Sequence, residues 1–437
     1  MEWYWAFAFL IGWVICFMAL GVPVAFAFIA TNFIAVYTFT GFDASALIQV
    51  ADNSTQLISR FTLGPVPMFI LMGSLFFHTG LALKVFDGLD AIFGRLPGRL
   101  CYLTVAGGAI FSTLTGSSMA NTAMLGSLMV PEMRRRGYSK QMSMGPILGT
   151  GGLAMIIPPS ALGVLLAAIA EIDVGRLLVA GLLPGFTLAL LYAMMITLQL
   201  WRYPGSAPAY DVEPMSIGKR LMLVTTNILP MGLVVFMVIG FIVLGLATPT
   251  EAAACGVLGV FLVAIGFRSL TLGAVSTSVE ATVKVGAMVF LIIMNSTVFS
   301  QMLAYSGASK GLIEWVTSYD LHRFAILFLM FCVLILLGMF MDATSMMLIT
   351  VPIFFPLAGA MGFDLIWYGL FVLITIEMAG TTPPFGLLLY VMLGVAPKGT
   401  TLIDVAKAAF PFLICDAILI LILVAWPNLA LWLPNQM

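Results

Sequence analysis

The sequence predicts an all-α membrane protein built as an inverted repeat, with about ten spanning helices, two re-entrant helical hairpins and two discontinuous helices. Composition is the first reason: 62% of the 437 residues are hydrophobic and only 8% are charged, against about 45–50% and about 25% in soluble domains. Long apolar runs and landmarks that recur at one offset are the other two reasons. So few charges exclude a soluble enzyme, a nucleic-acid-binding protein and a disordered protein.

The apolar runs give the expected helices in order. A spanning helix needs about 20 residues, with a range of about 17–25, and most of the runs qualify. The runs are 4–20, 22–38, 64–82, 100–115, 119–131, 145–172, 177–200, 222–245, 251–267, 285–304, 324–341, 346–360, 365–395 and 409–431.

Two of these runs are too long for one span, and a proline pair interrupts each of them. Pro158-Pro159 interrupts 145–172, and Pro383-Pro384 interrupts 365–395. Proline removes an amide donor and disfavours helix in the residue before it, so we expect each helix to unwind there and to free backbone carbonyls. Such backbone is tolerated in a membrane only where protein or a polar cavity surrounds it.

Four shorter runs combine into two hairpins, at about 100–131 and about 324–360. The first turns at the polar stretch 115–122 and the second at 342–345. We expect each hairpin to enter the membrane, turn at its small polar tip and leave on the side it entered. Two further segments, roughly 83–97 and 306–320, mix charges with apolar residues, which is typical of helices that lie in the interface plane.

Paired landmarks indicate a duplication of the chain. Three pairs lie 225, 227 and 226 residues apart: the proline pairs 158–159 and 383–384, the tips 117–118 and 344–345, and the prolines 23 and 249. The sequence therefore predicts two domains. Residues 1–215 form the first inverted repeat, with hairpin 100–131 and broken helix 145–172, and residues 216–437 form the second, with hairpin 324–360 and broken helix 365–395.

The orientation of the two halves follows from their basic residues. Each half crosses the membrane five times, and an odd number inverts the second half relative to the first. With both termini on the outer side of the membrane, 14 of the 18 lysines and arginines fall on the cytoplasmic side, as the positive-inside rule requires. If 4–38 and 222–267 were each one long helix, the split would fall to 12 against 6. The charges therefore favour ten crossings and termini on the outer side, which in a bacterial inner membrane would be the periplasmic side.

The breaks and tips carry groups that bind ions. Inverted repeats with discontinuous helices indicate a secondary transporter with a site at the membrane midplane. Each hairpin tip begins a helix in mid-membrane, and the free amides of that helix favour an anion, whereas unwound carbonyls suit a small hard cation. We expect one cation site at 116–122 with 149–152 and 157–160, another at 342–345 with 380–384, and an anionic substrate between them.

The same residues could also serve structural roles. Clusters of small residues are common wherever transmembrane helices pack closely. Asp342 is an ionisable residue at membrane depth, and it could bind a cation, stabilise the tip or cap the following helix. Glu377 lies three residues before a break, where gating, support of the site and plain packing are all open.

Six short segments, in a fixed order, run through almost the whole chain. They are Gly21-Val22-Pro23-Val24-Ala25-Phe26, Gly116-Ser117-Ser118-Met119-Ala120-Asn121, Ile157-Pro158-Pro159-Ser160, Ala247-Thr248-Pro249-Thr250-Glu251-Ala252-Ala253, Met341-Asp342-Ala343-Thr344-Ser345 and Thr382-Pro383-Pro384-Phe385-Gly386. Together they resemble the large membrane subunit (DctM-like, M subunit) of the tripartite ATP-independent periplasmic (TRAP) transporters.

This resemblance implies a multi-pass protein of the bacterial inner membrane, with a fold like that of the ion transporter superfamily. It implies sodium-gradient-driven symport of an organic anion, a carboxylate or a sugar acid, by an elevator mechanism in which hairpins and broken helices slide past a scaffold. No cofactor is expected beyond sodium as the coupling ion. The expected partners are a small four-helix membrane subunit, here a separate chain, and a periplasmic substrate-binding protein.

The resemblance also implies the site residues. Those expected to bind sodium are Ser117, Ser118, Asn121, Gly152, Pro158, Asp342, Thr344, Gly380 and Thr382. Those expected in the substrate-binding region are Ser117, Thr122, Ser160, Ser345 and Thr381.

Three other functions compete with this one. The main alternative is a sodium/dicarboxylate symporter of related inverted-hairpin fold that needs no binding protein. An intramembrane enzyme would need a nucleophile-base pair or a metal set, but the sequence has no HExxH or GxSxG motif and its two histidines are far apart. A channel would transport without any ion gradient.

Overall fold

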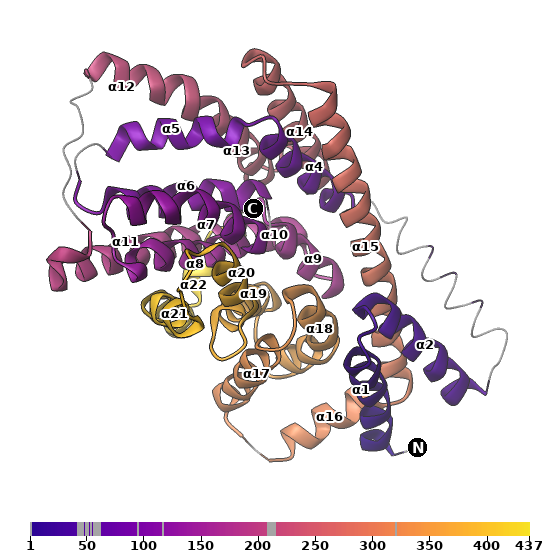
Figure 1. Cartoon of the computed structure of the whole chain (residues 1–437). Helices are drawn as coiled ribbons and strands as arrows, with labels where there is room; N and C mark the ends of the chain where they lie inside the picture. Colours follow the sequence, from indigo (N-terminus) through magenta and orange to yellow (C-terminus); the bar gives the residue numbers. More distant parts are fainter. Residues whose placement is uncertain are drawn as a thin grey trace.

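The computed structural model describes residues 2–41, 48, 52, 55, 63–93, 96–115, 118–207, 216–319 and 321–437. Every regular element in these ranges is helical, which confirms the all-α class (Figure 1). The helices of the first half are α1 (Trp3–Ala19), α2 (Val24–Thr40), α4 (Pro65–His78), α5 (Leu81–Phe93), α6 (Arg99–Thr115), α7 (Ser118–Arg135), α8 (Lys140–Ile156), α9 (Ala161–Ile169), α10 (Val174–Ala180) and α11 (Leu182–Arg202).

The second half starts after the short 3₁₀ turn η2 (Pro204–Ser206). Its helices are α12 (Ile217–Leu223), the π-helical η3 (Val224–Ile228), α13 (Leu229–Val243), α14 (Pro249–Gly266), α15 (Leu272–Tyr305), α16 (Ala308–Thr317), α17 (Arg323–Gly338), α18 (Ala343–Ala360), α19 (Leu365–Thr381), α20 (Leu387–Val395), α21 (Leu402–Ala425), α22 (Asn428–Leu431) and the 3₁₀ turn η4 (Pro434–Gln436).

The helix bounds of the two halves repeat with one offset. Adding 226 to the bounds of α9 gives those of α20, and the same shift brings α8 within one residue of α19. The packing repeats as well: α6 and α7 contact α8, as α17 and α18 contact α19, and α9 lies against α18 as α20 lies against α7. The relative inversion of the halves stays a prediction.

Several helices are long and apolar enough to span a bilayer. Six pass this test in the described residues, and two bent pairs, α4 with α5 (69°) and α8 with α9 (46°), raise the number to eight. Further apolar helices are only 16 or 17 residues long, among them α1, α2, α17 and α19. The described helices thus form a polytopic membrane protein, and ten crossings stay a prediction.

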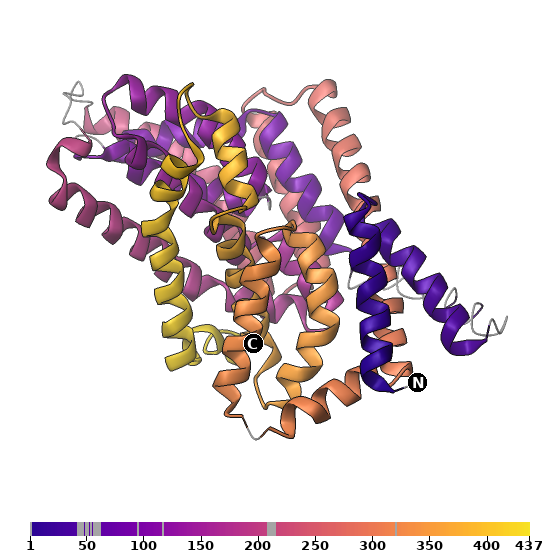
Figure 2. The same ribbon diagram turned by 60° about the horizontal axis from the view of Figure 1, so that its bottom comes forward.

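One helix is longer than the sequence pattern predicts. The apolar run covers 285–304, but α15 extends over 34 residues from Leu272 to Tyr305, about 51 Å at 1.5 Å per residue. Its first turns are polar yet helical, because Thr271 caps them by accepting a hydrogen bond from the Ala274 amide and Glu280 pairs with Lys284 at 2.6 Å. Helix α15 runs from the α13–α14 pair to the α1–α2 pair (Figures 1 and 2).

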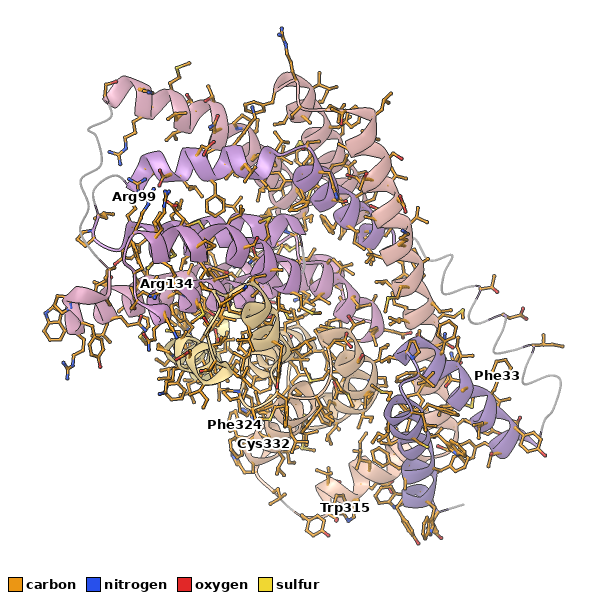
Figure 3. The ribbon with its side chains drawn as sticks, viewed as in Figure 1. Phe33, Arg99, Arg134, Trp315, Phe324 and Cys332 are labelled. Carbon is orange, nitrogen blue, oxygen red and sulfur yellow. The ribbon has the colours of Figure 1, made fainter. Side chains whose placement is uncertain are left out.

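The predicted interface segments form two short helices, α5 and α16. Each begins just after a glycine with positive φ, Gly80 (72°) and Gly307 (72°). An ion pair joins Asp90 of α5 to Arg99, the first residue of α6, which lies beside α5 in Figure 3. On α16, the ring of Trp315 lies 6.3 Å from that of Trp3. Each of these helices therefore has an anchor on a neighbouring helix.

Candidate functional site

The two helix breaks fall where the proline pairs are. Helix α8 ends at Ile156 and α9 begins at Ala161, while α19 ends at Thr381 and α20 begins at Leu387. Both Pro-Pro bonds are cis. The Ser160 hydroxyl caps α9 by accepting a hydrogen bond from the Gly163 amide at 3.0 Å, so this predicted substrate-binding hydroxyl has a structural partner.

Asp342 lies at the turn of the second hairpin, directly before α18. Its carboxylate accepts hydrogen bonds from the Thr344 amide (3.1 Å) and the Ser345 amide (3.3 Å), and the Ser345 hydroxyl also donates to it. Asp342 is therefore the N-cap of α18, one of the roles that the sequence allows. A role in cation binding stays a prediction, because a carboxylate oxygen has lone pairs beyond those used by two amides.

The first hairpin places Ser118 at the start of α7. Gly116 and Ser117, which precede Ser118 in the predicted tip, lie outside the described residues. The Ser118 hydroxyl oxygen lies 2.8 Å from Glu377 Oε2 and 3.2 Å from the Gly151 carbonyl oxygen. This cluster joins the first hairpin, the first broken helix and the second broken helix at one point.

Glycine at position 151 lets the Glu377 carboxylate lie directly against α8. An added Cβ there would lie 2.0 Å from Glu377 Oε1. Glu377 is only 3% exposed, and its Oε1 has no hydrogen-bond partner among the described residues. The sequence points to Glu377 but leaves its role open, because its contact Ser118 lies 259 residues away in the sequence.

The other tip residues of the first hairpin pack into the same region. Asn121 donates from Nδ2 to the Thr150 hydroxyl at 3.3 Å, and Thr150 donates to the Ile147 carbonyl. Thr122 is fully buried. The tip thus lies directly beside the glycine-rich part of α8.

A cavity of about 300 Å³ lies between the two tips and the two breaks. Four of the predicted sodium residues line it: Ser118, Asp342, Thr344 and Gly380. Its remaining walls are mostly apolar and come from α8, α9, α19 and α20 on one side and from α4 and α15 on the other.

The remaining predicted residues in the described part of the chain do not line this cavity. Thr381 and Thr382 donate to carbonyls of the last turn of α19, at 3.2 Å to Glu377 and 2.6 Å to Met378. Pro158 is buried in the first break. Those outside the lining are Asn121, Thr122, Gly152, Pro158, Ser160, Ser345, Thr381 and Thr382.

Gly152 faces a second buried polar group, which sequence reasoning missed. A Cβ on Gly152 would lie 2.9 Å from Tyr192 Oη and 3.5 Å from Asp416 Oδ1, and the Tyr192 hydroxyl donates to Asp416. Asp416 is 4% exposed within α21. An acidic residue inside the apolar run 409–431 is the signal that could have found it.

Comparison with known proteins gives the family. Residues 11–429 match the family described as "Tripartite ATP-independent periplasmic transporter, DctM component". The chain is 30% identical to the C4-dicarboxylate TRAP transporter large permease protein DctM of Rhodobacter capsulatus, over 97% of this chain and 98% of that protein. It is 27% identical to the sialic acid TRAP transporter large permease protein SiaM of Vibrio cholerae, over 97% of each.

A solved structure has the same fold. The YdaH transporter of Alcanivorax borkumensis matches with a TM-score of 0.63 at 15% identity, over 88% of this chain and 90% of that chain. The relatives are permease subunits of transporters and not enzymes. Because the family model matches nearly its whole length, the chain belongs to the DctM family, the large permease subunits of TRAP transporters.

Proposed function

We propose that this subunit carries an organic anion, a carboxylate or a sugar acid, across the bacterial inner membrane by symport with sodium. The observation that carries the proposal is the cavity of about 300 Å³, which is lined by residues of both hairpin tips and of the helices that flank both breaks. The relatives named for C4-dicarboxylates and sialic acid support the substrate class.

Sodium would bind where hydroxyl and carbonyl oxygens meet at the tips and breaks. Unwound backbone and helix ends coordinate sodium and anionic substrates in transporters with discontinuous helices. The proposed ligands at the first tip include Ser118, Asn121 and Gly152, and those at the second include Asp342, Thr344 and Gly380. Apart from the Asp342 carboxylate, these ligands offer neutral oxygens, which suit a weakly held ion that must be released on the other side.

An elevator movement would expose the cavity to each side in turn. The moving body would contain both hairpins and both broken helices, with α1, α2, α4, α13, α14 and α15 as the fixed frame. Helices α5 and α16 would connect the two parts. The recurrence of helix bounds and packing at one offset supports an inverted repeat of 1–215 and 216–437.

Large permease subunits of TRAP transporters work with a small membrane subunit and a periplasmic binding protein. For this chain we propose a small four-helix subunit beside the frame and a binding protein that delivers the anion to the periplasmic face.

Reconstitution tests the proposal. The chain and its small subunit are placed in liposomes, and uptake of radiolabelled succinate and sialic acid is followed with and without the binding protein. Accumulation that needs an inward sodium gradient and the binding protein is expected. Equal accumulation without sodium would overturn the symport, and sodium-driven uptake without the binding protein would favour the independent dicarboxylate symporter.

A further inference from the structure

The carboxylate of Glu377 has no positively charged side chain paired with it among the described residues. It is 3% exposed, it makes no ion pair among the described residues, and its Oε1 has no hydrogen-bond partner there. Asp416, another acid, faces Gly152, the residue of α8 next to Gly151, so it adds no positive charge to this region. An unpaired carboxylate in a membrane interior is strongly unfavourable, so its charge calls for a cation.

The atoms around Glu377 are arranged to accept one. The Ser118 hydroxyl has a single proton, which can go to Glu377 Oε2 or to the Gly151 carbonyl but not to both. Several acceptor oxygens therefore remain together: both carboxylate oxygens of Glu377, the Gly151 carbonyl and the lone pairs of Ser118. A set of oxygens without enough protons among them is what a small hard cation binds.

We infer that Glu377 supplies the negative ligand of a sodium site that it shares with Ser118 and Gly151. The inference rests on the proposed sodium symport and adds a charged ligand from the opposite half of the chain. Because Gly151 lacks a side chain, Oε1 can approach the α8 backbone, where a Cβ would lie only 2.0 Å away.

The order of binding follows from the place of Glu377 in the cavity wall. Glu377 lines the same cavity as Asp342 and Thr344, so without a bound cation its charge repels an anionic substrate. Sodium at Glu377 removes that repulsion. The organic anion therefore binds after this sodium ion.

Sodium-dependent thermal stability tests the site without any transport assay. The full chain is purified in detergent, and its unfolding midpoint is measured as sodium replaces choline at constant ionic strength. A ligand that binds only the folded state raises the midpoint in proportion to its saturation. We expect Glu377→Gln to raise the half-saturating sodium concentration at least tenfold, and the exposed Glu280→Gln to leave it unchanged.

A second variant covers the case in which Glu377→Gln does not fold. Gly151→Ala keeps the carboxylate but displaces Oε1, and the same rise is expected. Gly12→Ala in α1, where a Cβ meets no atom within 4 Å, is its control.

The outcomes separate this inference from the proposed function. A wild type that ignores sodium overturns both, whereas a wild type that responds and a Glu377→Gln or Gly151→Ala variant that responds equally overturn only the Glu377 site. A midpoint that ignores sodium but depends on pH through Glu377 would assign a proton there, and it would also overturn the sodium site.

Discussion

Ser118 shows how one hydroxyl can connect distant parts of this chain. Its oxygen lies within hydrogen-bond distance of Gly151 in the first half and of Glu377 in the second. The residue type and its place at a helix start are visible in the sequence. Its partner 259 residues away is not, because only the fold brings the two together.

Replacing Ser118 removes a proposed sodium ligand and leaves Glu377 Oε2 without its donor. We expect Ser118→Ala to raise the sodium concentration for half-maximal uptake about tenfold, which is about 1.4 kcal/mol, with normal membrane insertion. The check is uptake against sodium in liposomes. Ser127→Ala is the matched control, since Ser127 is exposed on the same helix and donates only to the Met124 carbonyl; unchanged sodium dependence in Ser118→Ala would contradict the assignment.

Asp342 both caps α18 and carries a negative charge, and two substitutions separate these two roles. Asparagine caps a helix about as well as aspartate, whereas alanine loses about 0.5–2 kcal/mol. If the charge binds sodium, Asp342→Asn keeps wild-type thermal stability but needs more sodium for uptake, and Asp342→Ala loses both. Unfolding midpoints and sodium titrations of uptake measure the two effects. Wild-type sodium dependence in both variants would leave Asp342 as a cap alone.

At the scale of helices, small residues set how closely the hairpins approach the broken helices. A Cβ on Gly108 of α6 would lie 2.4 Å from Thr150 Cγ2 of α8, and one on Gly338 of α17 would lie 2.4 Å from Ala379 Cβ of α19. Close approach through small residues is a general feature of helix packing in membranes. A glycine therefore allows the close contact of α6 with α8 in the first half and of α17 with α19 in the second.

A large side chain at this contact should separate α17 from α19. Overpacking typically costs about 1–3 kcal/mol, so we expect Gly338→Leu to lower the thermal unfolding midpoint of the detergent-solubilised chain. Gly232→Leu in α13, where a Cβ meets nothing within 4 Å, should leave the midpoint unchanged. Equal midpoints for the two variants would mean that α17 and α19 are not held at this contact.

The elements were predictable where their causes are local. Each Pro-Pro pair ends a helix within its own neighbourhood, so the breaks at 157–160 and 382–386 follow directly from the sequence. The polar start of α15 was not predictable from hydropathy, because its helix is stabilised by Thr271 and the Glu280–Lys284 pair rather than by apolar periodicity. Neither the Tyr192–Asp416 pair nor the contact of Glu377 with Ser118 was predicted, because the partners lie 224 and 259 residues apart in the sequence.

At the scale of the whole molecule, the cavity lies at the boundary between two groups of helices. Its lining includes Val66 and Ile70 of α4 and Val285 and Val289 of α15, opposite the hairpins and broken helices. If those two groups move relative to each other, the surroundings of the α4 and α15 residues must change.

Thiol labelling detects such a change. In a chain whose native cysteines are replaced by serine, Val285→Cys should react with a membrane-impermeant maleimide at a rate that changes when sodium and substrate are added. Val279→Cys, on the same helix outside the cavity lining and about equally exposed (45% against 46%), should react at a constant rate. Equal rates at position 285 in both conditions would contradict an elevator movement past α15.

The glycines before α5 and α16 determine the direction in which these helices follow α4 and α15. At Gly80 and Gly307 a side chain would meet no atom within 4 Å, yet both residues have a φ of 72°, where an L-residue other than glycine is disfavoured by about 1–2 kcal/mol. Backbone torsion, rather than contact with neighbouring side chains, therefore selects glycine at these positions. Two halves with different side chains can thus turn into α5 and α16 in the same way, because each turn contains a glycine in the left-handed region.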